Sequence, residues 1–101
     1  MLELPAGWDW EIHRYDGWRL TLIGDVDLTY HWNREVIFCD VTHLACPFQF
    51  CDPIFREPTP RELASVREDE PAVVVAFDVE DMPCLIAAES VAIRHGTVMR
   101  R

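Results

Sequence analysis

Three stretches near the N-terminus alternate apolar and polar residues with a period of two, as β-strands with one buried face do. They cover residues 8–14, 18–23 and 26–33. Turn-forming residues, among them Asp16-Gly17 and Gly24-Asp25, separate these stretches. The pattern therefore predicts three antiparallel strands joined by two tight hairpins.

The register of these hairpins follows from keeping the apolar residues on one face, because a shift by one residue turns every side chain to the other face. Three-residue loops at 15–17 and 23–25 satisfy this condition, and they pair Leu20 with both Ile12 and Leu28. We expect the resulting inner face to form the core. It would carry all four tryptophans, which are Trp8, Trp10, Trp18 and Trp32.

The second half of the chain predicts three more strands, at residues 35–46, 72–79 and 84–93, with apolar residues on both faces. Residues 48–51 lie between two prolines and are expected to form a loop, because proline cannot donate to a strand ladder. Residues 94–101 allow either a short strand or a frayed end.

A helix is expected from Thr59 to Glu68. Thr59 can cap it, Pro60 suits the first helical position, and Glu62 completes a capping box. With 101 residues the chain is expected to form a single domain over residues 1–101. The predicted fold is α+β and mostly β, an antiparallel sheet of five or six strands with one short helix packed on it.

Charge narrows the classes of partner. Eighteen acidic residues against nine basic ones give a net charge of −9, which disfavours binding to nucleic acid or to an anionic membrane.

No apolar run approaches the ~18 to 20 residues of a membrane-spanning helix. The first residues lack the features of a secretory signal. We therefore expect a cytoplasmic protein whose four cysteines are reduced.

The predicted register gathers four carboxylates on the outer, water-facing side of the first three strands: Asp9, Glu11, Asp25 and Asp27. Glu11 and Asp27 would lie roughly 9.5 Å apart by sheet geometry, at the upper limit for an inverting glycoside hydrolase. An open sheet face has no means of raising one carboxyl pKa, so a solvated acidic face is favoured over catalysis. A third interpretation is a recognition surface for a basic partner. The hypothesis is an inhibitor or immunity-type protein that docks a basic partner, such as a nuclease-type toxin, without a cofactor.

Cys39, His43, Cys46 and Cys51 form a C-x3-H-x2-C-x4-C string that supports an alternative, a small metal- or thiol-dependent enzyme. The string lacks the C-x2-C knuckle of most structural zinc sites, so buried, unligated thiols are favoured. No Gly-x-Ser-x-Gly elbow, phosphate-binding glycine loop or His-Glu-x-x-His pair occurs.

Phe48 and Phe50 are a second candidate contact surface. If exposed, they would suit either a partner protein or a homo-oligomeric structural domain.

Overall fold

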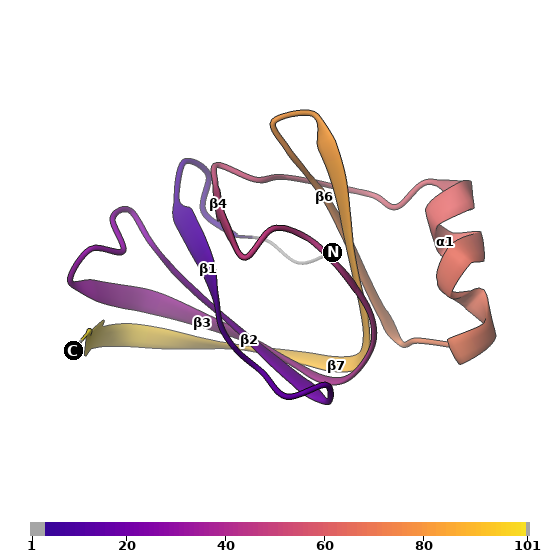
Figure 1. The fold of residues 1–101 in the computed structure, drawn as a ribbon, viewed down its shortest axis with the longest axis horizontal. Helices are drawn as coiled ribbons and strands as arrows, with labels where there is room; N and C mark the ends of the chain where they lie inside the picture. Colours follow the sequence, from indigo (N-terminus) through magenta and orange to yellow (C-terminus); the bar gives the residue numbers. More distant parts are fainter. Residues whose placement is uncertain (1–3, 101) are drawn as a thin grey trace.

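The computed structural model describes residues 4–100. Within these residues, seven antiparallel strands form one curled sheet in the order β4-β1-β2-β3-β7-β6-β5 (Figure 1). The prediction of a mostly β fold with one short helix is confirmed, but the number of strands is seven, not five or six. The elements are β1 (Asp9–Tyr15), β2 (Arg19–Asp25), β3 (His31–Ala45), β4 (Gln49–Cys51), β5 (Ile54–Arg56), α1 (Pro60–Val66), a 3-10 turn η1 (Arg67–Asp69), β6 (Val73–Val79) and β7 (Met82–Met99).

The long strands β3 and β7 pair with each other at the centre of the sheet, and each pairs with one further strand on its other side. β2 pairs with residues 34–39 of β3, and β6 pairs with residues 82–88 of β7. The β3–β7 register shifts between Val41 and His43, next to Asp40, whose φ of 54° is left-handed. A bulge of this kind bends a strand and increases the local twist.

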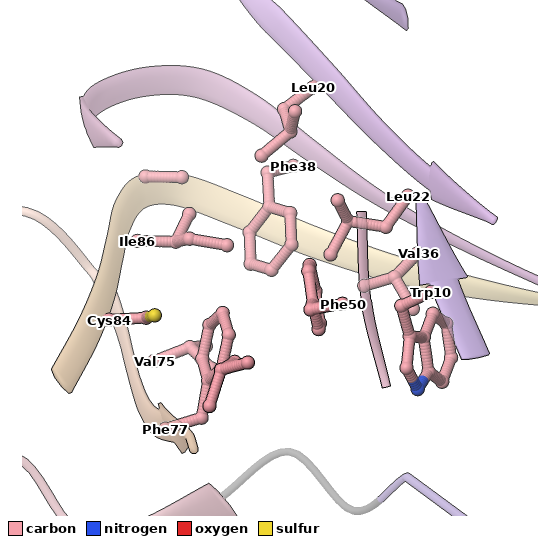
Figure 2. Packing of buried hydrophobic residues seen from close by; sticks show 12 residues of the cluster. Trp10, Leu20, Leu22, Val36, Phe38, Phe50, Val75, Phe77, Cys84 and Ile86 are labelled. Carbon is pink, nitrogen blue, oxygen red and sulfur yellow. The ribbon is translucent and has the colours of Figure 1, made fainter. Parts of the chain in front are cut away.

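The curl encloses the core. Trp10, Leu20 and Phe38 face Phe77 and Ile86 from the other half of the sheet (Figure 2), and all five are at most 1% exposed. Both edge strands contribute a phenylalanine to the same contact. Phe50 of β4 and Phe55 of β5 lie 5.3 and 5.2 Å from Phe77 between ring centroids, so the two edges of the sheet meet across the core.

The prediction of a loop at residues 48–51 is wrong, since Gln49–Cys51 forms β4 and pairs with β1. The two prolines that suggested a loop, Pro47 and Pro53, stand just outside the three paired residues. Their missing N–H groups therefore remove no hydrogen bond from the pairing of β4 with β1.

The predicted register of the first hairpin is also wrong. Trp10 pairs with Gly24 and Ile12 with Leu22, and a bulge lies between Ile12 and Arg14. The bulge adds a residue that the period-two pattern did not reveal. Trp10 is 1% exposed, as expected of a core residue, whereas Trp18, which precedes the first residue of β2, is 70% exposed and lies at the surface.

The strand predicted at 26–33 begins only at His31, and it continues without a break into the strand predicted at 35–46. Residues 26–30 form a loop because carboxylates hold the backbone in turns. Asp25 accepts the N–H of Val26, and Asp27 accepts the N–H of Thr29. The undecided residues after 93 extend β7 to Met99.

The helix begins as predicted, with both hydrogen bonds of the Thr59–Glu62 capping box present. It is shorter than expected: α1 ends at Val66 and continues as η1. Val66 is buried against Ala76 and Leu85 of the sheet. No helix within residues 4–100 has the length and apolar character needed to cross a membrane.

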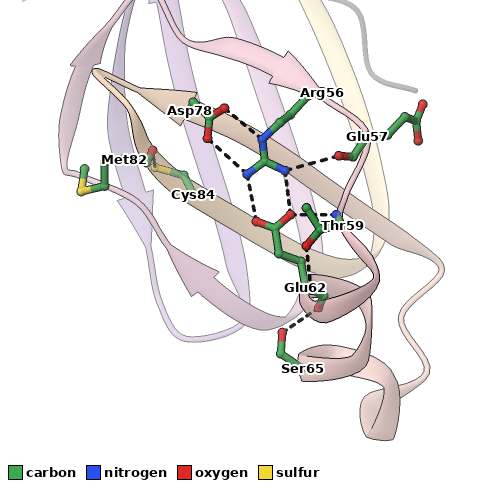
Figure 3. A network of polar contacts seen from close by, with 8 residues as sticks. All are labelled: Arg56, Glu57, Thr59, Glu62, Ser65, Asp78, Met82 and Cys84. Carbon is green, nitrogen blue, oxygen red and sulfur yellow. Dashed lines mark hydrogen bonds and ion pairs between the residues drawn. The ribbon is translucent and has the colours of Figure 1, made fainter.

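Arg56 ties α1 to the sheet (Figure 3). Its guanidinium donates to Glu62 at 2.6 and 3.0 Å and to Asp78 of β6 at 3.0 and 3.2 Å. The same Glu62 carboxylate accepts the N–H of Thr59. One residue therefore links β5, the helix cap and β6.

Candidate functional site

The pairing of β4 with β1 joins the strand of Asp9 and Glu11 to the segment that follows Phe48. Phe50, the other expected contact residue, is 5% exposed and belongs to the core. Asp9 pairs with Cys51 and Glu11 with Gln49, and the N–H of Ile12 donates to the carbonyl of Phe48 at 2.8 Å. We call the resulting region the β4 surface. It consists of Asp9, Glu11, Asp27, Phe48, Gln49 and Cys51.

Two hollows flank β4 and share Gln49, Phe50 and Cys51 in their walls. The first, of about 480 Å³, is polar and is lined by carboxylates from β1 and the β2–β3 loop together with Arg100. The second, of about 450 Å³, extends toward the β6–β7 hairpin and includes Met82. The second hollow is mainly apolar in character, with Glu80 as its charged residue.

Glu11 does not face water as expected, because it is only 7% exposed. Its carboxylate accepts hydrogen bonds from Gln49 Nε2 at 2.7 Å and from the guanidinium of Arg100 at 3.0 Å. Arg100 also donates to the carbonyl of Leu28, so the C-terminal end of the described chain and the β2–β3 loop cover this part of the outer face. The expected cross-strand row with Asp27 does not form, since Glu11 pairs with Ile23.

Asp25 is likewise buried, at 8% exposure, where the sequence pattern placed it on the wet face. Its Oδ2 lies 2.7 Å from Nδ1 of His31, and its Oδ1 accepts the N–H of Val26 at 2.7 Å. The carboxylate therefore holds the turn into β3 and has little surface left for a partner.

Asp9 and Asp27 remain as the accessible carboxylates of the polar hollow, with Asp9 half-buried and Asp27 exposed. Neither forms an ion pair with any residue between 4 and 100. Hydrogen bonds from the hydroxyl and the N–H of Thr29 lower the pKa of Asp27, which keeps this carboxyl charged.

Cys51 is exposed on β4 and lies among carboxylates that act on its thiol. A hydrogen bond to Asp9 raises the pKa of this thiol, and the charges of Asp9, Glu80 and Asp52 raise it further. Three carboxylates from different segments therefore act on one point of β4. The β4 surface is a region of negative potential.

The four residues of the candidate metal string do not come together. Cys39 and His43 lie on β3 on either side of its bend, Cys46 follows β3, and Cys51 lies on β4. Within residues 4–100 no three His, Cys, Asp or Glu side chains are placed to hold a metal ion.

Three of the four thiols, those of Cys46, Cys51 and Cys84, are poorly suited to nucleophilic chemistry, which requires a thiolate. Burial raises the pKa of Cys46 to about 12. Burial also raises the pKa of Cys84, and carboxylates raise that of Cys51. A thiolate nucleophile is therefore not favoured at Cys46, Cys51 or Cys84.

Sequence reasoning missed Gln49, Arg100 and the apolar hollow beside Met82. The alternation Phe48-Gln49-Phe50-Cys51 is itself a period-two pattern and could have indicated β4. Arg100 lies 89 positions from Glu11, and no local pattern predicts such a contact.

Comparisons of this chain with protein families, with curated proteins and with solved structures find no match in any of the three.

Proposed function

We propose that this protein is a non-catalytic binding protein that docks a basic protein through the β4 surface. One observation carries the proposal. Asp9 of β1 and Asp27 of the β2–β3 loop line one hollow beside β4, and neither carboxylate forms an ion pair with a residue between 4 and 100. The exposed ring of Phe48 stands at the start of β4.

Charge and shape both favour a basic protein as the occupant. The polar hollow of about 480 Å³ can receive arginine or lysine side chains, whose charges would meet the carboxylates at its wall. Phe48 and Met82 are 64% and 46% exposed and offer the apolar contacts that anchor interfaces. The net charge of −9 accelerates association with a basic surface and suppresses association with acidic ones.

Within this proposal, we assign the protein to the inhibitor or immunity type, acting in the cytoplasm. A nuclease-type toxin is the partner class that fits best, because a surface that binds nucleic acid phosphates is basic and would accept carboxylates in their place. The free state of all four thiols accords with a reducing compartment.

The test compares two double variants of equal charge. Asp9→Asn/Asp27→Asn alters the β4 surface, and Glu68→Gln/Asp69→Asn alters η1; each changes the net charge from −9 to −7. The probe is a fluorescent peptide of alternating arginine and tryptophan, and its association rate is measured by stopped flow at several salt concentrations.

We expect the β4 variant to slow association several-fold and the η1 variant to leave it close to the wild-type rate. The difference should fade as salt shortens the Debye length from about 30 Å at 0.01 M to a few Å. Equal rates for the two variants would contradict the proposal, because binding would then follow total charge and not the β4 surface.

A further inference from the structure

The C-terminal half of β7 has a free edge. β3 pairs with β7 along one side from residue 85 to Met99, whereas β6 covers the other side only from Met82 to Ala88. From Glu89 to Met99, no strand within residues 4–100 pairs with that second side. Figure 1 shows this yellow half of β7 running along the border of the sheet.

From Glu89 to His95 this edge lacks the features that normally prevent strands from pairing between molecules, which are short length, proline, lysine and bulges. The two terminal strands of the sheet, β4 and β5, contain three residues each and are flanked by prolines. Residues 89–99 contain neither proline nor lysine. The β3–β7 register is unbroken from Ala88 to His95, and only beyond His95 does it shift, near Gly96 with its φ of 133°.

We propose that two copies of the chain pair antiparallel through Glu89–His95 of β7, about a two-fold axis at Ala92. Such an axis stands perpendicular to the sheet and keeps the core-facing sides of both copies together. It is the register that uses the whole regular segment. The opposed pairs are Glu89 with His95, Ser90 with Arg94, Val91 with Ile93, and Ala92 with its own copy.

These pairs are chemically complementary. A carboxylate meets an imidazole, a hydroxyl meets a guanidinium, and two β-branched residues meet each other, whereas no like charges are opposed. A two-fold axis at Arg94 would oppose two guanidinium groups and is disfavoured. Val91 and Ile93 already pack against the core, so their pairing continues the apolar layer from one copy into the next.

The local charge supports a second copy as the occupant even though the whole chain carries −9. Between Glu89 and Met99 there is one carboxylate, and Arg94 and His95 accompany it. Overall repulsion between two acidic chains weakens with salt. Dimerisation should therefore strengthen as salt rises, which is opposite in sign to docking of a basic partner at the β4 surface.

The first experiment measures mass by analytical ultracentrifugation over a wide range of protein concentrations. We expect the wild type to reach twice its 11.8 kDa chain mass. Glu89→Arg should weaken dimerisation roughly 2- to 30-fold, because the pair occurs twice in the dimer. Adding His95→Glu to that variant should restore it. A monomer at every concentration, or a dimer that Glu89→Arg leaves unchanged, would overturn the proposal.

The second experiment tests the register. Directly opposed residues in an antiparallel pair have Cα atoms about 4.5 to 5.5 Å apart, within the range that a disulfide spans. In a Cys51→Ser background, Ala92→Cys should oxidise to a dimer linked through the introduced cysteines, as mapped by mass spectrometry. Ala72→Cys, also exposed but outside β7, is the control. Cross-linking of Ala92→Cys no faster than the control would contradict this register.

Discussion

The indole of Trp10 occupies the space that a side chain at Gly24, its cross-strand partner, would need. A Cβ atom at residue 24 would overlap three atoms of the ring. Gly24 is therefore required because any larger residue would clash with the ring, and the contact between them closes the core where β1 pairs with β2.

Gly24→Ala should lower the free energy of unfolding by about 1 to 3 kcal/mol, as other overpacked core variants do. Urea denaturation followed by tryptophan fluorescence measures this. In a Trp10→Ala background the same substitution should cost much less, because the clash is gone. An equal cost in both backgrounds would show that the ring is not the cause.

The two tryptophans nearest the first hairpin should differ sharply. Trp10→Ala removes a residue that is 1% exposed and should cost about 3 to 5 kcal/mol of unfolding free energy. Trp18→Ala removes one that is 70% exposed and should stay within about 0.5 kcal/mol. Thermal or urea unfolding of the two variants measures both costs. Similar costs for Trp10→Ala and Trp18→Ala would mean that the observed register is wrong.

Elements that depend on neighbouring residues could be predicted from the sequence. The helix start at Thr59–Glu62 is one, because the capping box is formed within four residues. The β6–β7 hairpin is another, since the apolar runs end at Glu80 and Asp81, which take positive φ in the turn.

Elements that depend on distant residues could not be predicted. The bulge between Ile12 and Arg14 has no signature in the alternation, and Trp18, expected in the core, lies before β2 at the surface. At the candidate site, Asp9 and Asp27 were foreseen as accessible carboxylates. The burial of Glu11 could not be predicted, because it depends on Arg100 from the far end of the described chain.

Glu11 should now behave as a structural residue. Glu11→Ala leaves Gln49 and Arg100 without their acceptor and should cost about 1 to 3 kcal/mol. Glu57→Ala, at an exposed carboxylate whose side chain makes no hydrogen bond with residues 4–100, should change stability by less than about 0.5 kcal/mol. Denaturant unfolding of both variants at neutral pH measures the change in unfolding free energy. Equal changes would indicate that Glu11 is a solvated surface residue without a structural role.

The free energy of unfolding should fall in acid because the Glu62 carboxylate becomes protonated. Hydrogen bonds from Arg56 hold the pKa of this carboxyl at about 2, below its usual 4.5. A lowered pKa stabilises the folded chain above the unfolded-state pKa, and this contribution is lost as pH falls from about 4.5 to about 2. Glu62→Gln should therefore be less stable than wild type at neutral pH and comparable to it near pH 2.

Glutamine can keep the capping box, so that comparison isolates the charge. Glu68→Gln, at an exposed position in η1, is the control and should parallel the wild type across the pH range. If the difference between Glu62→Gln and wild type were independent of pH, the Arg56 contact would not set the titration.

The rate of thiol labelling at Cys51 tests the negative potential of the β4 surface. Asp9 is the largest cause of the raised Cys51 pKa, so Asp9→Asn should lower that pKa, increase the thiolate fraction and speed reaction with iodoacetamide near pH 8. Peptide mass spectrometry separates Cys51 from the other cysteines. Asp69→Asn should leave its rate unchanged, and the same rate in all three proteins would argue against an electrostatic origin.

The continuity of β3 and β7 has a consequence for how the chain comes apart. Each strand serves both halves of the curled sheet, so neither half possesses a full set of backbone partners by itself. Opening one half would strip hydrogen bonds from strands on which the other half depends. Local melting of one half is thereby suppressed, and we expect a protease or a denaturant to meet the two halves as one cooperative unit.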